Sequence, residues 1–236
     1  MIEIINLKKS FDDFKVLKEI NLSIREGEIT AIVGPNGSGK TTLIKSILDL
    51  IKIDFGKISI GKYVLNGKCE YRKQIGYMPQ ITRFPENLTV SQLIEMIKDI
   101  RNQTGNLDEE LFEKFLMEKE LPKQIKNLSG GTKQKLNAII SFMFNPQLYI
   151  LDEPTASLDP IASSELKDKI IKENKNGKTF LITSHNMHEI EELASNIIFM
   201  IDGEIAYCGS LSNLKFETKE DNLERAIANL MRLSKN

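Results

Sequence analysis

Apolar residues recur along this chain with two different periods, and the change of period locates the expected elements. Alternation with a period of two predicts half-buried strands over 2–7 and 20–24. Continuous apolar runs predict strands that are covered on both faces, and these runs are 28–34, 147–153 and 178–184. Helical spacing predicts helices over 40–51, 90–101, 107–117, 161–174, 188–194 and 219–233. The alternation of these elements predicts an α/β fold.

The middle of the chain differs from the two ends. Short strands are expected at 56–60 and 75–80, but no further strand pattern occurs before residue 147. We therefore expect a mostly helical segment, about 81–146, inserted into an α/β core. The core resumes with a strand at 147 and includes a hairpin over 196–209 that turns at Asp202-Gly203. This organisation predicts one domain over 1–215 and a C-terminal helical tail over 216–236.

Charge and composition exclude several classes of protein. The chain has 236 residues, 32 basic and 33 acidic, with a net charge of -1. This balance argues against broad electrostatic binding to nucleic acid or to a membrane surface. No apolar run approaches the ~20 residues that span a bilayer, and no leader segment opens the chain. We expect a cytoplasmic protein with no lipid anchor, whose Cys69 and Cys208 are free thiols.

The segment GPNGSGKTT (34–42) matches the phosphate-binding pattern G-x-x-x-x-G-K-[ST]. It follows an expected strand and opens an expected helix, which is the context that this pattern requires. Glycines let backbone N–H groups turn onto phosphate oxygens, and the start of the helix adds its positive dipole end. Lys40 is expected to reach the β- and γ-phosphates, and the Thr41 hydroxyl to bind Mg²⁺. The candidate nucleotide-binding residues here are Gly34, Pro35, Asn36, Gly37, Ser38, Gly39, Lys40, Thr41 and Thr42.

Two carboxylates follow a second buried strand. A P-loop enzyme needs an acidic residue at the end of a neighbouring strand to hold magnesium, and LYILDE (148–153) supplies one. Asp152 is the expected metal-side acid. Glu153 is placed to activate the attacking water as a general base. Acidic pairs at strand ends are common on surfaces, so this pair indicates a magnesium site only in combination with the P-loop.

A second glycine-containing segment suited to binding an anion, here called a glycine cradle, occurs far from the phosphate-binding segment 34–42. NLSGGTKQK (127–135) places two glycines after Ser129 and before an apolar-periodic helix. The motif LSGGT resembles the signature LSGGQ of the ATP-binding-cassette (ABC) ATPases, the nucleotide-hydrolysing subunits of ABC transporters. The resemblance implies the ABC-ATPase fold, a P-loop NTPase fold with an antiparallel β subdomain and an inserted α-helical subdomain. It also implies a head-to-tail dimer, most simply a homodimer, in which Ser129, Gly130 and Gly131 of one chain hold the γ-phosphate on the other chain's P-loop.

The remaining family motifs occur in the same order, over roughly residues 1 to 215. By resemblance, Gln80 is the Q-loop glutamine that contacts Mg²⁺ or water, and His185 is the switch histidine that holds the γ-phosphate. Asp159 is similar to the D-loop aspartate that crosses the dimer interface, and it is also a plausible N-cap. Phe11 occupies the family's adenine-stacking position, with Val16 beside the ring. Phe14 is an alternative stacking residue, and Phe11 as an ordinary core aromatic is another alternative.

The chain departs from the family pattern at a few positions. Thr132 replaces the usual glutamine of the signature, and Phe11 replaces the more common tyrosine. Tyr149 places a phenol inside an apolar strand, where it needs a partner. Because Asp152 and Glu153 are unaltered, we expect a site that is competent to hydrolyse ATP with Mg²⁺.

The resemblance also implies a separate transmembrane permease subunit. We expect it to dock on the helical subdomain near Phe84, Pro85 and Leu88, unless these residues pack into the subdomain's own core. The chain would then be peripheral on the inner membrane. The stretches YMPQITRFPENLTV and LSGGTKQKLNA look most like the subunit that accompanies copper-enzyme maturation, of the nitrous oxide reductase assembly type.

Two other functional classes fit the sequence less well than an ABC-transporter ATPase. An ABC protein that acts on ribosomes or DNA would normally carry two cassettes or long coiled coils, and neither pattern occurs here. A P-loop kinase or other non-ABC nucleotide binder would leave LSGGT and His185 without a role.

Overall fold

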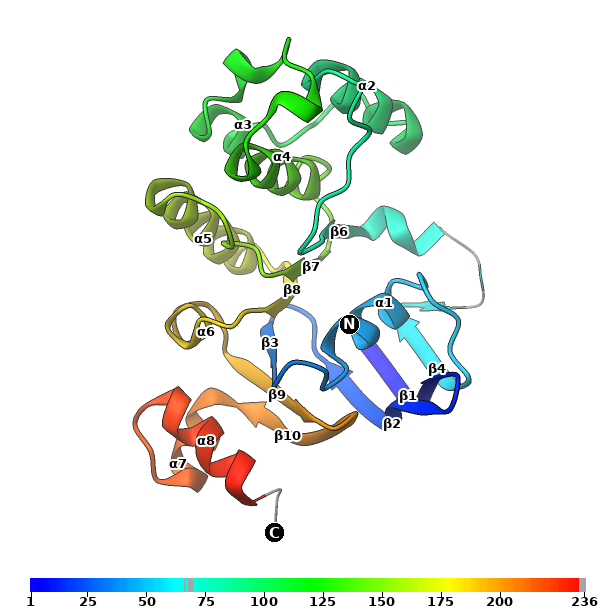
Figure 1. The fold of residues 1–236 in the computed structure, drawn as a ribbon, viewed down its shortest axis with the longest axis vertical. Helices are drawn as coiled ribbons and strands as arrows, with labels where there is room; N and C mark the ends of the chain where they lie inside the picture. Colours follow the sequence, from blue (N-terminus) through cyan, green and yellow to red (C-terminus); the bar gives the residue numbers. More distant parts are fainter. Residues whose placement is uncertain (66, 68–69, 234–236) are drawn as a thin grey trace. The chain divides into compact units, whose positions relative to one another are not determined.

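The computed structural model describes residues 1–65, 67 and 70–233 (Figure 1). The chain forms two compact units. One contains residues 1–72 and 179–236, and the other contains residues 73–178. The second unit includes the segment 81–146 predicted as a helical subdomain, together with flanking strands and a helix. Cys69, which we expected to be a free thiol, lies outside the described residues, whereas Cys208 is a free and exposed thiol.

The first unit begins with an antiparallel sheet (blue and cyan in Figure 1). Its strands follow the order β2-β1-β4-β5. Their bounds are Ile2–Phe11 for β1, Phe14–Ile24 for β2, Phe55–Ile60 for β4 and Tyr63–Val64 for β5. Ile2 faces both Ile24 and Ile60 across the sheet. Alternate apolar side chains on β1 and β4 are buried, as the period-two pattern predicts.

The same unit contains a parallel layer. Strand β3 (Ile29–Val33) pairs in parallel with β8 (Thr179–Thr183) and with β9 (Asn196–Ile201). All five residues of β3 and all five of β8 are buried, which confirms the expectation from their continuous apolar runs. Strand β10 (Glu204–Ser210) returns antiparallel to β9 after a turn at Asp202-Gly203, as predicted.

Helices complete the first unit. Helix α1 (Lys40–Ile47) follows β3, α6 (Met187–Leu193) follows β8, and a 3₁₀ turn spans Glu70–Gln74 across the boundary between the units. The expected helix over 40–51 is too long, because Asp49 adopts a left-handed φ of 51° that ends the helical path. At the C-terminus, α7 (Leu211–Thr218) was not predicted, whereas the amphipathic tail forms α8 (Leu223–Leu233).

The second unit pairs two parallel strands with helices (teal through green to yellow-green in Figure 1). Strands β6 (Ile75–Met78) and β7 (Leu148–Asp152) lie side by side. The α-helices are α2 (Val90–Arg101), α3 (Glu110–Lys114), α4 (Gly130–Phe142) and α5 (Pro160–Lys175). Two 3₁₀ turns, Met117–Glu120 and Ile125–Asn127, connect α3 to α4.

The predicted helix over 107–117 is largely wrong. Only the five residues of α3 are α-helical, because Leu116 adopts a left-handed φ of 52° and redirects the chain. At the other end, the Asp108 side chain accepts a hydrogen bond from the Glu110 N–H, which starts the helix late. Tyr149, flagged as a buried phenol, stacks on Phe142 with ring centroids 4.4 Å apart. No helix in the described ranges is long and apolar enough to cross a bilayer.

Candidate functional site

The P-loop turns sharply between β3 and α1 in the first unit. Gly34, Gly37 and Gly39 all have positive φ angles, of 152°, 81° and 102°. A Cβ at Gly34 would lie 2.1 Å from the Met200 carbonyl oxygen, so this position requires glycine. The Lys40 ammonium group donates to the Gly34 and Pro35 carbonyls at 2.7 and 3.1 Å. These bonds place the cation over the loop that the sequence predicts to hold phosphates.

The loop has the chemistry of an anion cradle. Gly39 is the N-cap residue of helix α1, and no side chain in the described residues caps the N-terminus of this helix. The first turn of such a helix presents unpaired N–H groups and a positive dipole end. The Ser38 hydroxyl is buried and has no hydrogen-bond partner among the described residues. A phosphate would satisfy these donors, and the donor set therefore fits a nucleotide.

Two other segments of the first unit, at Gly203 and at Val16, pack against the P-loop. The Gly203 N–H donates to the Ser38 carbonyl at 3.2 Å, and the Gly203 carbonyl accepts from the Lys18 N–H at 3.0 Å. A Cβ at Gly39 would lie 3.0 Å from the Val16 carbonyl oxygen. The Val16 backbone therefore lies beside the P-loop, and its expected contact with the adenine stays a prediction. The supporting role of Gly203 was missed, although the sequence shows it as a hairpin turn.

The two candidate stacking residues lie at the end of the β1–β2 hairpin. Phe11 and Phe14 face each other across the strands. Their exposed fractions are 47% and 70%, so the alternative that Phe11 is a core aromatic is wrong. The Lys9 ammonium lies 5.0 Å from the centroid of the Phe11 ring. Both side chains are thus exposed, and the Phe11 ring has the Lys9 ammonium over one face.

His185 follows β8 in the first unit and is exposed. The backbone around it is held by buried polar groups. The Ser184 hydroxyl donates to the Glu189 carboxylate at 2.6 Å and accepts from the Asn186 N–H at 3.0 Å. The Asn186 side chain caps α6 through the His188 N–H at 3.0 Å. These contacts leave the His185 side chain at the surface on a well-defined turn.

The acidic pair lies at the end of β7 in the second unit. Asp152 is 6% exposed, whereas Glu153 is half-buried and has a left-handed φ of 54°. Burial, and then the negative charge of Asp152, raise the pKa of Tyr77 to about 12. A buried carboxylate of this kind supplies the hard oxygen ligand that Mg²⁺ prefers.

The signature turn opens helix α4 in the same unit. Ser129 caps the helix, with its Oγ accepting from the Thr132 N–H at 3.2 Å, and this hydroxyl also lies 2.9 Å from Thr132 Oγ1. Thr132 therefore contacts the signature serine directly. A Cβ at Gly131 would lie 2.9 Å from the Ser157 carbonyl oxygen, so the signature glycine packs against the segment SLDP (157–160), which contains Asp159. Ser129 and Gly130 are exposed.

The Asp159 carboxylate has two partners within its own chain. Its Oδ1 accepts from the Ala162 N–H at 2.9 Å, which confirms the N-cap interpretation for α5. Its Oδ2 lies 2.6 Å from the Lys135 ammonium on α4. The N-cap does not exclude the expected role of Asp159 at a dimer interface, which stays a prediction.

The expected docking segment after Gln80 is open to the surface. Gln80 and Pro85 are exposed, and Phe84 and Leu88 are half-buried. Ile81 is 70% exposed. Pro85 is therefore outside the core of the helical segment, whereas the half-buried Phe84 and Leu88 fit either alternative.

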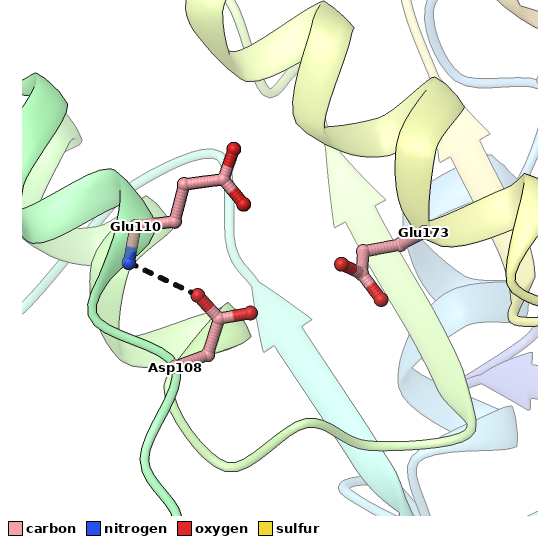
Figure 2. Close-up of side chains that lie close together, drawn as sticks. All are labelled: Asp108, Glu110 and Glu173. Atoms are coloured by element: carbon pink, nitrogen blue, oxygen red, sulfur yellow. Dashed lines mark hydrogen bonds between the residues drawn. The ribbon is translucent and has the colours of Figure 1, made fainter.

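An acidic cluster in the second unit could be mistaken for a metal site. Figure 2 shows Asp108, Glu110 and Glu173 with their carboxylates turned toward one another, within 4.8 Å. The Lys169 ammonium contacts all three at 2.5, 2.8 and 3.0 Å. Burial lowers the pKa of Lys169, but these hydrogen bonds outweigh it and raise the pKa above its usual value. The ammonium thus already fills the position that a metal ion would take.

The predicted site residues are distributed over both units. The first unit carries Phe11, Val16, the P-loop residues 34–42 and His185, and the second carries Gln80, Ser129, Gly130, Gly131, Asp152, Glu153 and Asp159. Within each unit, the groups lie at strand ends, helix N-termini and turns. Such positions present backbone N–H groups and carboxylates toward a ligand.

Comparisons with known proteins agree with these features. Residues 17–156 match the sequence model of the ABC transporter family. The chain is 32% identical over 220 residues to the ABC transporter ATP-binding protein YtrB of Bacillus subtilis, covering 92% of this chain and 74% of that protein. It is 30% identical over 233 residues to the L-cystine import ATP-binding protein TcyN of the same organism, covering 94% and 90%.

Solved structures show the same fold. An ATP-binding subunit of an ABC transporter superposes with a TM-score of 0.90 at 27% identity, covering 98% of this chain and 99% of the other. The dimeric cassette MJ0796 in a post-hydrolysis state, bound to ADP and Pi, gives a TM-score of 0.79 at 26% identity, covering 89% and 99%. The α/β ABC-ATPase fold expected from the motifs is therefore confirmed. The chain belongs to the ABC transporter family, as an ATP-binding subunit and ATP hydrolase.

Proposed function

We propose that this chain binds magnesium-ATP on its P-loop and hydrolyses it within a head-to-tail homodimer, in order to drive a separate membrane subunit. The observation that carries the proposal is the exposed signature turn. Ser129 and Gly130 stand exposed at the N-terminus of a 13-residue helix, α4. This is the geometry of an anion site. The P-loop has its own complete set of donors, so a second cradle is best explained as the other wall of a nucleotide site in a second copy.

Each residue has a defined role in this proposal. The P-loop N–H groups and Lys40 bind the phosphates. Thr41, Asp152 and Gln80 would hold Mg²⁺, which when bound offsets the phosphate charge. Glu153 would accept a proton from the attacking water, and His185 would hold the terminal phosphate. Phe11 and Val16 would contact the adenine, and Asp159 would lie at the dimer interface.

The membrane partner belongs to the same proposal. We place its contact on the segment after Gln80, where Ile81 is 70% exposed and Pro85 is exposed. Peripheral attachment to the inner membrane would then depend on this partner. The proteins to which the chain is similar include ATP-binding proteins named for L-cystine import and for linearmycin resistance, and their names span import and resistance.

The copper-enzyme maturation subtype stays a prediction from the two sequence stretches that suggested it. The structure adds no copper chemistry to support it. Among the described residues, the one group with metal-ligand spacing is the acidic cluster that Lys169 fills. Copper sites prefer imidazole and sulfur ligands. A role on ribosomes or DNA has no support from the relatives reported above.

A trapped dimer tests the proposal. Glu153→Gln keeps the size of the side chain but removes the base, so ATP should bind and the closed dimer should accumulate. Size-exclusion chromatography with ATP and Mg²⁺ should show a dimer for this variant and a monomer without nucleotide. Adding Lys40→Ala to the same chain should abolish the dimer, because the ammonium that binds the phosphates is lost. A variant that stays monomeric at saturating ATP would contradict the sandwich arrangement.

The signature needs a separate test. Ser129→Arg fills the exposed cradle with a large cation, which should block hydrolysis by the dimer. Binding of ATP to the monomer should be unchanged, because the P-loop is untouched; it is measured as the ATP-induced rise in melting temperature. Turnover at the wild-type rate would contradict the role of Ser129 across the interface.

Purification with the membrane subunit, compared with vesicle binding by the chain alone, tests whether attachment to the membrane depends on that subunit.

A further inference from the structure

Helix α4 carries two buried amide side chains that hold the backbone of the catalytic segments. Gln134 and Asn137 are 6% and 3% exposed. The Gln134 Nε2 donates to the carbonyls of Pro154 at 3.2 Å and Glu153 at 3.4 Å. The Asn137 Nδ2 donates to the Gln134 Oε1 at 3.5 Å and to the Pro79 carbonyl at 3.0 Å. One amide pair thus contacts the backbone at Glu153 and the residue before Gln80.

The backbone at Glu153 needs such a support. Its φ of 54° is left-handed, a conformation that costs a non-glycine residue of order 1–3 kcal/mol and persists only when surrounding contacts determine it. The Glu153 carbonyl also accepts from the Ala156 N–H at 3.1 Å, which closes the turn after the strand. The Gln134 amide ties this turn to a different element, helix α4.

The same helix begins at the signature turn. Ser129 is the N-cap of α4, and Gln134 is the fifth residue of the helix. At 1.5 Å per residue they are separated by about 7.5 Å of continuous helix, too short to bend appreciably. A shift of the signature turn on binding an anion would therefore move the Gln134 amide with it. The Glu153 backbone would follow through the two hydrogen bonds.

We propose that Gln134 is a positioning residue for Glu153, which couples the signature turn to the general base. The inference rests on the proposed head-to-tail dimer. In that dimer the signature turn of a chain contacts one nucleotide, whereas Glu153 of the same chain acts on the other. Gln134 therefore links the two nucleotide sites through a single side chain. Its amide donates to the backbone carbonyls of Glu153 and Pro154, so it would act on the reaction only through Glu153.

Replacement by leucine tests the role. Gln134→Leu keeps the volume of the side chain but removes the donor, so the hydrogen bond to the Glu153 carbonyl is lost. Because misplacing a reacting group by about 1 Å can cost of order 10²-fold in rate, we expect kcat to fall about 10-fold or more. KM and the ATP-induced melting shift should remain within about twofold of wild type, because the P-loop is unaffected. A merely structural role would not produce this separation of kcat from KM.

Ser141→Ala is the matched control. The Ser141 hydroxyl is buried on the same helix and donates to the Tyr77 carbonyl at 2.9 Å, so its loss also removes a buried hydrogen bond to backbone. The hydroxyl also lies 2.7 Å from the Asn137 carbonyl, and neither of these two acceptors belongs to Glu153. Its melting temperature should fall by an amount comparable to that of Gln134→Leu, while its kcat should stay within about twofold of wild type.

A double-mutant cycle with Glu153→Gln completes the test. If Gln134 acts through the Glu153 carboxylate, adding Gln134→Leu to Glu153→Gln should leave the residual single-turnover rate unchanged. A kcat for Gln134→Leu within twofold of wild type, a parallel loss of ATP binding, or a fully additive effect in the cycle would each overturn the proposal. Failure of Glu153→Gln to dimerise would instead contradict the sandwich dimer, while the cycle would still report on Gln134.

Discussion

The Lys135 ammonium lies 2.6 Å from Asp159 Oδ2 and joins the helix that begins at the signature turn to the N-cap of the next helix, α5. The other Asp159 oxygen accepts from the Ala162 N–H. A single carboxylate thus fixes the segment SLDP against α4. In the proposed dimer this segment meets the second chain, so the contact sets the shape of the interface within each chain.

The titration of Asp159 should depend on Lys135. The hydrogen bond from Lys135, and then that from the Ala162 N–H, lower the pKa of Asp159. Because the pKa of Asp159 is lower in the folded chain than in the unfolded chain, where it is about 3.9, its ionised form stabilises the fold above that pH. This stabilisation is lost as the pH falls from about 3.9 through the lower pKa of the folded chain. Lys135→Met should raise the pKa of Asp159 toward the ordinary value, measured by NMR titration of the side-chain carboxyl. An unchanged pKa would show that the ion pair does not persist in solution.

Removing Lys169 should strongly destabilise the second unit. Lys169→Met would leave the three carboxylates of Figure 2 without their buried cation. Breaking a buried ion pair by removing one partner costs about 3–5 kcal/mol. We expect a loss of this size at pH 7 in urea unfolding.

In the wild type, hydrogen bonds from Lys169 and then Lys172 lower the pKa of Glu110 to about 2. Its contribution to stability is therefore present above the unfolded value of about 4.3 and disappears as the pH falls toward 2.

Lys172 provides the control for that prediction. Its ammonium lies 2.8 Å from Glu110, but its side chain is 59% exposed, against 2% for Lys169. Exposed ion pairs contribute about 0–1 kcal/mol. Lys172→Met should therefore change stability far less than Lys169→Met. Equal losses for the two variants would mean that the cluster is hydrated in solution.

Gly203→Ala should weaken both the fold and the P-loop. Its φ is 79°, and a Cβ would lie 2.4 Å from the Val16 carbonyl oxygen. Gly177 has a similar φ of 87° with nothing within 4 Å, so Gly177→Ala measures the backbone strain alone. We expect a larger fall in melting temperature for Gly203→Ala than for Gly177→Ala. ATP affinity should fall in Gly203→Ala alone, because its N–H supports the Ser38 carbonyl; equal effects would refute this support.

The two exposed phenylalanines should differ in their contribution to ATP affinity. Stacking of a base on an aromatic ring contributes about 1–3 kcal/mol. Phe11→Ala should therefore raise the Kd for ATP about tenfold or more, measured by isothermal titration with a catalytically inactive chain. Phe14→Ala should change it little. The opposite ranking would assign the stacking role to Phe14, on the facing strand.

Much of this protein follows from short-range patterns. The buried strands β3, β7 and β8 were predicted because residues covered on both faces must be continuously apolar. The hairpin at Asp202-Gly203 followed from the turn residues that a left-handed backbone requires. The N-cap at Asp159 followed from its position before a proline that begins a helix. The glycine cradles were recognised for the same local reason, since phosphate binding needs backbone N–H groups at a helix start.

Other features depended on contacts between residues far apart in the chain. The sequence left Phe11 open between core and surface, and pairing of the hairpin strands exposes it. The helix expected over 107–117 shortened to α3, because Leu116 adopts a left-handed conformation. The Lys169 cluster joins residues separated by about sixty positions, and the Gln134 amide reaches Glu153 nineteen residues away. Periodicity determines which residues are buried, but only the packed fold decides which buried polar groups meet, because their partners are brought together by the burial of everything around them.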